Sequence, residues 1–180
     1  ALGEPCYPSY RQILTALSLR PVGLVTEAET RFQPVAEQLT DDLAGLIVAS
    51  PANPTGTMLG KAELQDLSDA CEAKRISLIS DEIYHGLQYE GRAVSALEVT
   101  DEVYVINSFS KYFSMTGWRV GWMVVPDRHV RVVERLAQNL FICPGHAAQV
   151  AALAALDAGE ELAANLAVYA ENRRLMLEGL

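Results

Sequence analysis

The sequence predicts an α/β fold in three layers (α/β/α), with a mainly parallel sheet between two helical layers. Two observations predict it. Short apolar runs recur along the chain as far as Val125, and the segments between them carry apolar residues three and four positions apart. Runs that are apolar on both faces are typical of strands covered by helices on each side. We therefore expect parallel strands that alternate with helices.

The length and periodicity of each segment predict its type. The apolar runs are too short for helices, and turn-forming residues separate them. The five expected buried strands are residues 22–26, 46–49, 76–80, 103–107 and 120–125. The segment GKAELQDLSDACEAKR predicts a helix over residues 60–75, because Leu64, Leu67 and Cys71 recur on one helical face.

After Pro126 the pattern changes to helices alone. Helical spacing covers residues 128–140, 146–159 and 165–180. We expect these helices to cover the sheet or to lead into a further domain. The sequence starts at Ala1 without a methionine and ends inside a helical pattern, so we also expect it to be part of a longer protein.

Composition limits the class of protein. The chain has 180 residues, half of them hydrophobic, which is enough for one substantial core. Its formal net charge of -9 does not favour nucleic acid or an acidic membrane surface as a partner. Cys6, Cys71 and Cys143 lie far apart and match neither a disulfide framework nor a zinc cluster. No apolar run approaches the length of a membrane span, so we expect a cytoplasmic protein.

The first candidate binding segment follows the expected strand 46–49. Ligands of open α/β sheets bind beyond the carboxyl ends of the strands. Here the strand leads into SPANPTG, in which two prolines flank Asn53. A residue before proline is biased to extended backbone, which lets Asn53 present its amide away from the chain. The alternative is a turn selected only for its proline and glycine residues.

The second candidate segment, DEIYHGLQY, follows the expected strand 76–80. Asp81 would begin deep in the sheet, where a carboxylate is costly unless a cation or several donors meet it. A protonated ring nitrogen of a cofactor would be such a partner, with Tyr84 close by. The alternative is that Asp81 caps a helix or turn. His85 has no metal-ligand spacing around it and is expected to be structural.

The third candidate segment, SFSKYFSMTGWRVGW, follows the expected strand 103–107. Ser108 and Ser110 offer hydroxyls and Arg119 a guanidinium, which together suit a phosphate group. Lys111 is not a P-loop lysine, because the P-loop pattern is absent. A lysine beside another cation at a buried strand end is instead a competent nucleophile toward a carbonyl carbon. A Schiff-base lysine, a carboxylate for a ring nitrogen and a phosphate cradle are what pyridoxal 5'-phosphate requires.

These three segments resemble a known family. SPANPTG, SDEIY and SFSKYFSMTGWRVGW occur in the order found in class I and II aminotransferases, which belong to the fold type I pyridoxal phosphate dependent enzymes, and the similarity covers residues 4–156. The resemblance implies that Lys111 forms the Schiff base with the cofactor and later moves a proton between substrate and cofactor. It also implies that Asp81 pairs with the pyridinium nitrogen.

The resemblance assigns the remaining cofactor contacts as well. Asn53 and Tyr84 would bind the phenolic oxygen of the cofactor. The phosphate would lie against Ser108, Ser110 and Arg119.

Aromatic residues near these segments are further candidates. EPCYPSY is similar to the family segment whose aromatic residue stacks on the cofactor ring, which implies that Tyr7 is that platform. The alternative is a turn with a core tyrosine. Trp118 and Trp122 are expected to pack in the core against the sheet, and Thr116 has no assigned role.

The resemblance implies a function for the longer protein. Residues 1–180 would be the central part of the large, cofactor-binding domain, with an N-terminal segment and a C-terminal small domain lying outside this sequence. The protein would be a homodimer that moves an amino group between an amino acid and a 2-oxo acid. Two alternatives stay open: a C–S or other lyase on the same fold, or an aminotransferase-like sensing domain of a DNA-binding regulator.

Overall fold

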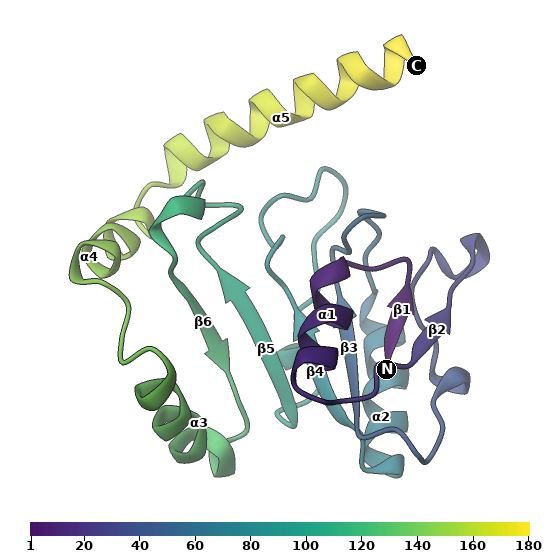
Figure 1. The fold of residues 1–180 in the computed structure, drawn as a ribbon. Helices are drawn as coiled ribbons and strands as arrows, with labels where there is room; N and C mark the ends of the chain where they lie inside the picture. The colour runs from purple at the N-terminus through teal and green to yellow at the C-terminus, as the bar shows by residue number, and fades with distance from the viewer.

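The computed structural model describes all 180 residues and contains a single six-stranded sheet (Figure 1). The strand order is β2-β1-β3-β4-β5-β6, and all neighbours are parallel except β5 and β6. The strands are β1 (Leu2–Glu4), β2 (Gly23–Val25), β3 (Gly45–Ala49), β4 (Ser77–Asp81), β5 (Val103–Ser108) and β6 (Gly121–Val124). The helices are α1 (Pro8–Ala16), α2 (Lys61–Lys74), α3 (Asp127–Leu140), α4 (His146–Ala155) and α5 (Gly159–Gly179). The predicted mainly parallel α/β sheet is confirmed.

The centre of the molecule has the expected three layers. Helix α2 buries Leu64, Leu67 and Cys71 against one face of the sheet, where they join the main core cluster with Leu78 and Val103. Burying a leucine side chain of this kind contributes about 1.5–3 kcal/mol. Helix α1 lies on the opposite face, in front of the central strands in Figure 1.

The sequence pattern misses one buried strand, and two of its predictions of burial are wrong. Strand β1 was not expected, because three residues are too short to show a pattern, yet its Leu2 is fully buried. Strand β6 is present, but all four of its residues are exposed, so this run is not a buried strand. Trp118 and Trp122 are 48% and 41% exposed and do not lie in the core, although Trp122 packs edge-to-face on Phe109 with ring centroids 5.2 Å apart.

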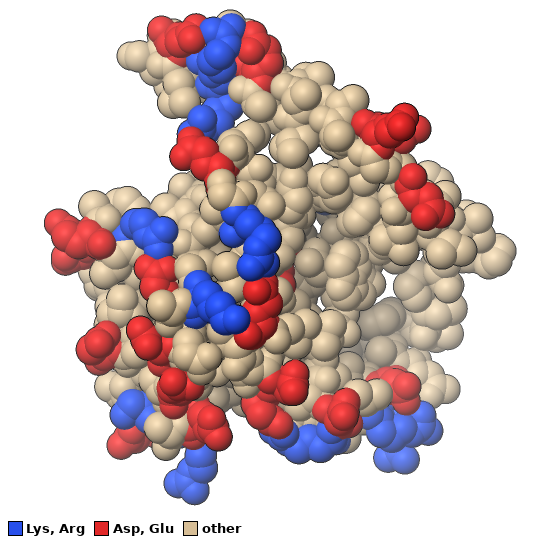
Figure 2. All heavy atoms as spheres, turned by 180° about the vertical axis from the view of Figure 1, so that it is seen from behind, with Lys and Arg blue, Asp and Glu red and all other residues tan.

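The three C-terminal helices form as predicted but cover little of the sheet. Helix α3 contains no buried residue, and α5 buries only Leu162. In Figure 1, α5 extends across the end of the sheet at which β5 terminates. Figure 2 shows the opposite side of the molecule, where basic side chains lie next to acidic ones. The surface ion pairs of the chain include Arg128–Glu102 and Arg92–Glu98. No helix is both long enough and apolar enough to cross a membrane.

Strand register determines which polar residues share a face of the sheet. Asp81 of β4 pairs with Ala49 of β3 on one side and with Ile106 of β5 on the other. Because side chains alternate along a strand, Ser108 points to the same face as Ile106 and hence as Asp81. Leu78 and Val103 point to the opposite face, toward α2. The polar strand ends therefore gather on the α1 side of one sheet edge.

Candidate active site

Asp81 ends β4 and accepts hydrogen bonds from two directions. The backbone N–H of Ile83 donates to Oδ1 at 3.1 Å, and the hydroxyl of Tyr10 donates to Oδ2. Burial, reinforced by the hydrogen bond to Asp81, raises the pKa of the Tyr10 phenol, so this group stays protonated as a donor. Helix α1 thus orients a carboxylate at the end of a strand far away in the sequence.

Lys111 follows β5 and lies over an aromatic ring. Its Nζ is 5.3 Å from the ring centroid of Tyr84, a cation–π separation that contributes about 0.5–1 kcal/mol at a partly exposed site. The carbonyl of Lys111 accepts a hydrogen bond from the backbone N–H of Ser114 at 2.9 Å, which closes a tight turn after the lysine. The structure therefore places two of the predicted residues, from different strand ends, side by side.

Ser108 and Ser110 form a compact hydroxyl pair. Their Oγ atoms lie 2.9 Å apart, and the backbone N–H of Ser110 donates to Ser108 Oγ at 3.0 Å. The side chain of Asn107 accepts from the backbone N–H of Ser108 at 2.8 Å. These bonds hold both hydroxyls at the end of β5, close to where Lys111 begins its turn.

Arg119 is exposed and is held in a strained backbone conformation. Its φ of 54° lies in the left-handed region, which costs a non-glycine residue about 1–2 kcal/mol. Its Nη1 donates to the carbonyl of Thr116 at 2.9 Å, and the Thr116 hydroxyl donates to the carbonyl of Ser110 at 2.6 Å. Thr116 therefore connects the guanidinium to the serine pair. Gly121 lets β6 lie close to the end of β5, because a Cβ there would lie 2.6 Å from the Asn107 carbonyl oxygen.

Asn53 lies in the loop after β3 and shares a cavity of about 610 Å³ with Tyr84. The loop is closed by backbone hydrogen bonds from Ala52 to Thr57 at 2.9 Å and from Gly56 to Ala52 at 2.8 Å. Lys111, Asp81 and the serine pair do not line this cavity. The structure thus brings Asn53 and Tyr84 to a common space.

Tyr7 immediately precedes α1 and is 44% exposed. Its ring meets that of Tyr10 edge-to-face, with centroids 5.6 Å apart and planes at 84°. Since Tyr10 binds Asp81, Tyr7 lies one side chain further from the carboxylate, on the α1 face. The core-tyrosine alternative does not hold, and its assignment as a stacking platform stays a prediction.

Two residues of the site have no role that the sequence predicts. Tyr10 follows Tyr7 by three residues and lies in the first turn of α1. Thr116 joins Ser110 to Arg119, which only the fold shows. Neither contact has a local sequence signal, because each joins segments that only the tertiary structure brings together.

Comparison with known proteins decides the family. The family model described as aminotransferase class I and II matches residues 1–180. The chain belongs to the aminotransferase class I and II family. Members of this aminotransferase family depend on pyridoxal phosphate, the cofactor that the strand-end residues predict.

Individual relatives of the chain agree with the family match. The chain is 46% identical over 187 residues to the valine–pyruvate aminotransferase of Mycobacterium tuberculosis. This match covers 100% of the chain and 48% of the relative. A crystal structure from Silicibacter pomeroyi matches with 67% identity and a TM-score of 0.94, covering 99% of this chain and 48% of that one. An aminotransferase structure from Mycobacterium tuberculosis matches with 46% identity and a TM-score of 0.94, covering 99% and 51%. The chain spans about half the length of the relatives it matches.

Proposed function

We propose that the protein containing this chain is a pyridoxal 5'-phosphate dependent aminotransferase that moves an amino group from an amino acid to a 2-oxo acid. One observation carries the proposal. Asp81 ends β4, Lys111 follows β5, and Arg119 precedes the antiparallel β6, so the three charged residues lie at the same end of neighbouring strands. None of them is in an ion pair within the chain. A ligand with a phosphate, an aldehyde and a basic ring nitrogen complements all three.

The residues present fit this cofactor chemically. Asp81 accepts one hydrogen bond on each oxygen, and a carboxylate has lone pairs left for a protonated ring nitrogen. Thr116 links the Arg119 guanidinium to the backbone carbonyl of Ser110, in the segment that carries both serine hydroxyls. Small hydroxyl donors and one guanidinium suit a phosphate group. The amine of Lys111 faces an aromatic ring and no carboxylate.

Lys111 and Asp81 would carry the chemistry. Pyridoxal 5'-phosphate supplies an aldehyde that takes amino groups and a ring that draws electrons from the substrate α-carbon. Lys111 would hold the aldehyde carbon through its amine and, once the substrate amine has replaced it, would move the proton of the α-carbon. Asp81 would keep the ring nitrogen protonated, and Tyr10 would keep Asp81 oriented. The amino acid leaves as its 2-oxo acid, and a second 2-oxo acid collects the amine.

The other predicted residues would fix the position of the ring. Asn53 and Tyr84 would donate to the phenolic oxygen of the cofactor. Tyr7 would offer an aromatic face to the ring, with Tyr10 behind it.

The place of these residues in a longer protein, the oligomeric state and the cellular location are also proposals. We infer that residues 1–180 are the central part of the large domain, with an N-terminal segment and a C-terminal small domain outside them, which the half-length match to the relatives supports. The family resemblance supports a homodimer. The acidic composition and the three free cysteines support a cytoplasmic location.

The test compares two lysine variants of the full-length protein. The name of the 46% identical relative makes valine and pyruvate the first substrates to assay, with alanine formation as the readout. We expect Lys111→Ala to lose about 10²–10⁴-fold in turnover together with the visible absorbance of the bound cofactor. Lys61→Ala, on the exposed face of α2, is the matched control and should behave as wild type. Full amino transfer by Lys111→Ala, or release of ammonia in place of alanine formation, would contradict the proposal.

A further inference from the structure

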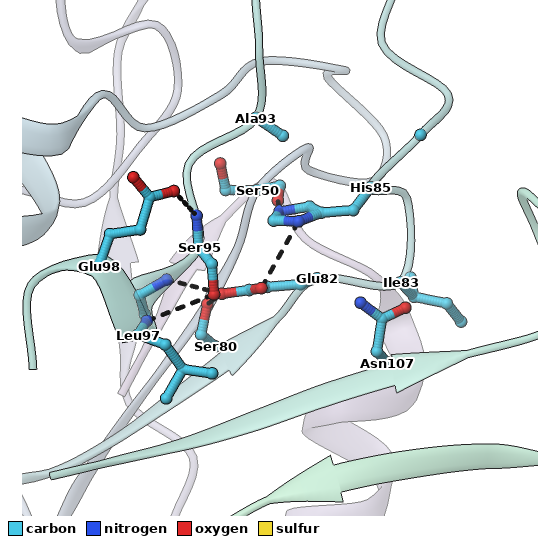
Figure 3. Close-up of polar contacts among 12 residues, drawn as sticks. Ser50, Ser80, Glu82, Ile83, His85, Ala93, Ser95, Leu97, Glu98 and Asn107 are labelled. Carbon is cyan, nitrogen blue, oxygen red and sulfur yellow. Dashed lines mark hydrogen bonds and ion pairs between the residues drawn. The ribbon is translucent and has the colours of Figure 1, made fainter. Parts of the chain in front are cut away.

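A buried carboxylate lies directly behind the candidate site. Glu82 follows Asp81 and is only 2% exposed. Its Oε1 accepts from the hydroxyl of Ser80 at 3.1 Å and from the backbone N–H of Ala96 at 2.8 Å, and its Oε2 faces the ring of His85 (Figure 3). A buried carboxylate is tolerated only with such partners. Glu82 therefore holds a fixed position on the face of the sheet opposite to that of Asp81.

His85 joins this carboxylate to the loop that carries Asn53. Its Nδ1 lies 3.5 Å from Glu82 Oε2, and its Nε2 lies 3.0 Å from the carbonyl oxygen of Ser50. A carbonyl oxygen only accepts, so Nε2 carries a hydrogen and donates it, and the contact with the Glu82 carboxylate is favourable when Nδ1 carries a hydrogen as well. Figure 3 shows the imidazole between Glu82 and Ser50. One ring therefore connects the segment after β4 with the segment after β3.

Ser50 is the anchor of the Asn53 loop. It is 1% exposed, its hydroxyl accepts from the backbone N–H of Leu59 at 2.9 Å, and its own N–H donates to the carbonyl of Asp81 at 3.1 Å. Asn53 comes three residues after Ser50, and Tyr84 immediately precedes His85. The hydrogen bond from His85 to Ser50 thus sets the separation between the backbones that carry Asn53 and Tyr84.

We propose that His85, oriented by Glu82, is a positioning residue that holds Asn53 and Tyr84 at the spacing needed to bind the phenolic oxygen of the cofactor. This inference rests on the proposed function. His85 would act through the Ser50 carbonyl and not by touching the cofactor. The sequence predicts only a structural role for His85, whereas the proposal makes it a residue that determines cofactor affinity.

The test uses three variants of the full-length protein. His85→Phe keeps an aromatic ring and removes both nitrogens, whereas His85→Gln keeps an N–H donor that can reach the Ser50 carbonyl. His129→Phe is the matched control, because half-buried His129 makes one side-chain hydrogen bond, to Tyr104 at 2.6 Å, at the opposite end of β5. The readouts are the affinity of the apoenzyme for pyridoxal 5'-phosphate and the ratio of the visible absorbance bands of the bound cofactor at fixed pH.

We expect His85→Phe to weaken cofactor affinity about tenfold, as for the loss of one well-placed hydrogen bond, and to shift the absorbance ratio because the phenolic oxygen loses its donors. His85→Gln should restore both readouts close to wild type, and His129→Phe should leave both unchanged. A folded His85→Phe with wild-type affinity and absorbance would overturn the inference and leave the proposed function standing. Absence of any cofactor binding or amino transfer by the wild type would instead overturn the proposed function.

A measurement without a substitution keeps the inference testable if His85→Phe does not fold. The ¹⁵N spectrum of the histidine side chains in the wild type, with the His85 signals assigned from His85→Gln, reports which nitrogen carries a hydrogen. We expect a protonated Nε2 whose hydrogen exchanges slowly with solvent. A bare Nε2 would contradict the bond to Ser50 and with it the inference.

Discussion

The central region, from β3 to Arg119 (residues 45–119), and the C-terminal helices α3–α5 (residues 127–179) differ in how they are stabilised. The central region contains most of the core, including the fully buried Leu46 and Val103. In the C-terminal helices, Leu136 and Leu153 are exposed, and α3 buries no residue. Both regions have helical or strand periodicity in the sequence. Periodicity in the sequence therefore predicts that a helix or strand forms, whereas its burial depends on which other segments pack against it.

The difference extends to polar interactions. Around the candidate site, hydrogen bonds connect separate strands and loops, such as Tyr10 to Asp81 and His85 to Ser50. In α5, the ion pairs of Arg174 with Glu171 and Glu178 stay within one exposed helix. Exposed pairs of this kind contribute about 0–1 kcal/mol each. The C-terminal helices are joined to the rest of the chain at fewer places, such as His129 of α3 to Tyr104 and Arg173 of α5 to Glu90.

The largest difference is expected for leucine truncation in the 180-residue chain. Leu46→Ala leaves a cavity beneath β3 and should lower the free energy of unfolding by about 2–5 kcal/mol. Leu136→Ala, at a side chain 58% exposed on α3, should change it by no more than about 0.5 kcal/mol. Urea unfolding followed by circular dichroism measures both values. Equal destabilisation by the two variants would contradict the claim that the core lies in the central region and not in the C-terminal helices.

A smaller but still large effect is expected for carboxylate removal in the full-length protein. Asp81→Ala should retain some cofactor yet react about 100-fold more slowly, because a ring nitrogen without its partner withdraws electrons poorly and general-acid–base chemistry is worth about 10²–10⁴-fold. Glu171→Ala removes an exposed carboxylate of α5 and should not alter turnover. Steady-state assays give the ratio. An unaffected rate for Asp81→Ala would show that this aspartate has been misassigned.

The arginines of the two regions are expected to differ in cofactor binding. A hydrogen bond to a charged group contributes about 1.5–3 kcal/mol, so Arg119→Ala should weaken affinity for pyridoxal 5'-phosphate by about 10–100-fold. Arg174→Ala removes two ion pairs on α5 and should leave the affinity unchanged. Absorbance titration of the apoenzyme measures both constants. If Arg119→Ala binds as tightly as wild type, the phosphate lies elsewhere.

The smallest effect concerns thiol reactivity in the 180-residue chain. Burial raises the pKa of Cys71 from 9.0 to about 11, so little thiolate forms at pH 8, whereas Cys143 is exposed. A thiol reagent should therefore label Cys143 quickly and Cys71 only as the chain unfolds. Because the unfolded state loses the Cys71 proton first, this cysteine's contribution to stability is present below pH 9 and falls as the pH rises toward 11. Rapid labelling of Cys71 at pH 8 would contradict its burial.

Much of the central region could be predicted from the sequence because its signals are local. A short apolar run followed by a polar residue indicates a strand end, and parallel strands bring their ends to one edge, which is where Asp81 and Ser108 lie. Helix α2 shows its buried face through the spacing of its leucines. These features need only the periodicity of a strand or helix and a rule of sheet topology.

The remaining features depend on tertiary contacts that periodicity does not reveal. Nothing near Tyr10 indicates that its hydroxyl meets Asp81, and nothing near Glu82 indicates that an acidic residue is buried. The opposite error occurs at Trp118 and along β6, where the apolar side chains predict burial but the residues are exposed. The left-handed backbone of Arg119 likewise follows from the turn before β6 and not from the residue type.

Reduction with borohydride tests directly whether Lys111 holds the cofactor, because it fixes a Schiff base to the lysine that forms it. The full-length protein is incubated with pyridoxal 5'-phosphate, reduced, digested and analysed by mass spectrometry. Lys61 and Lys74, both on α2, are internal controls within the same chain. We predict that the phosphopyridoxyl group is found on the peptide containing Lys111 and on neither control. Its attachment to Lys61 or Lys74, or an unmodified Lys111 peptide at saturating cofactor, would contradict the account.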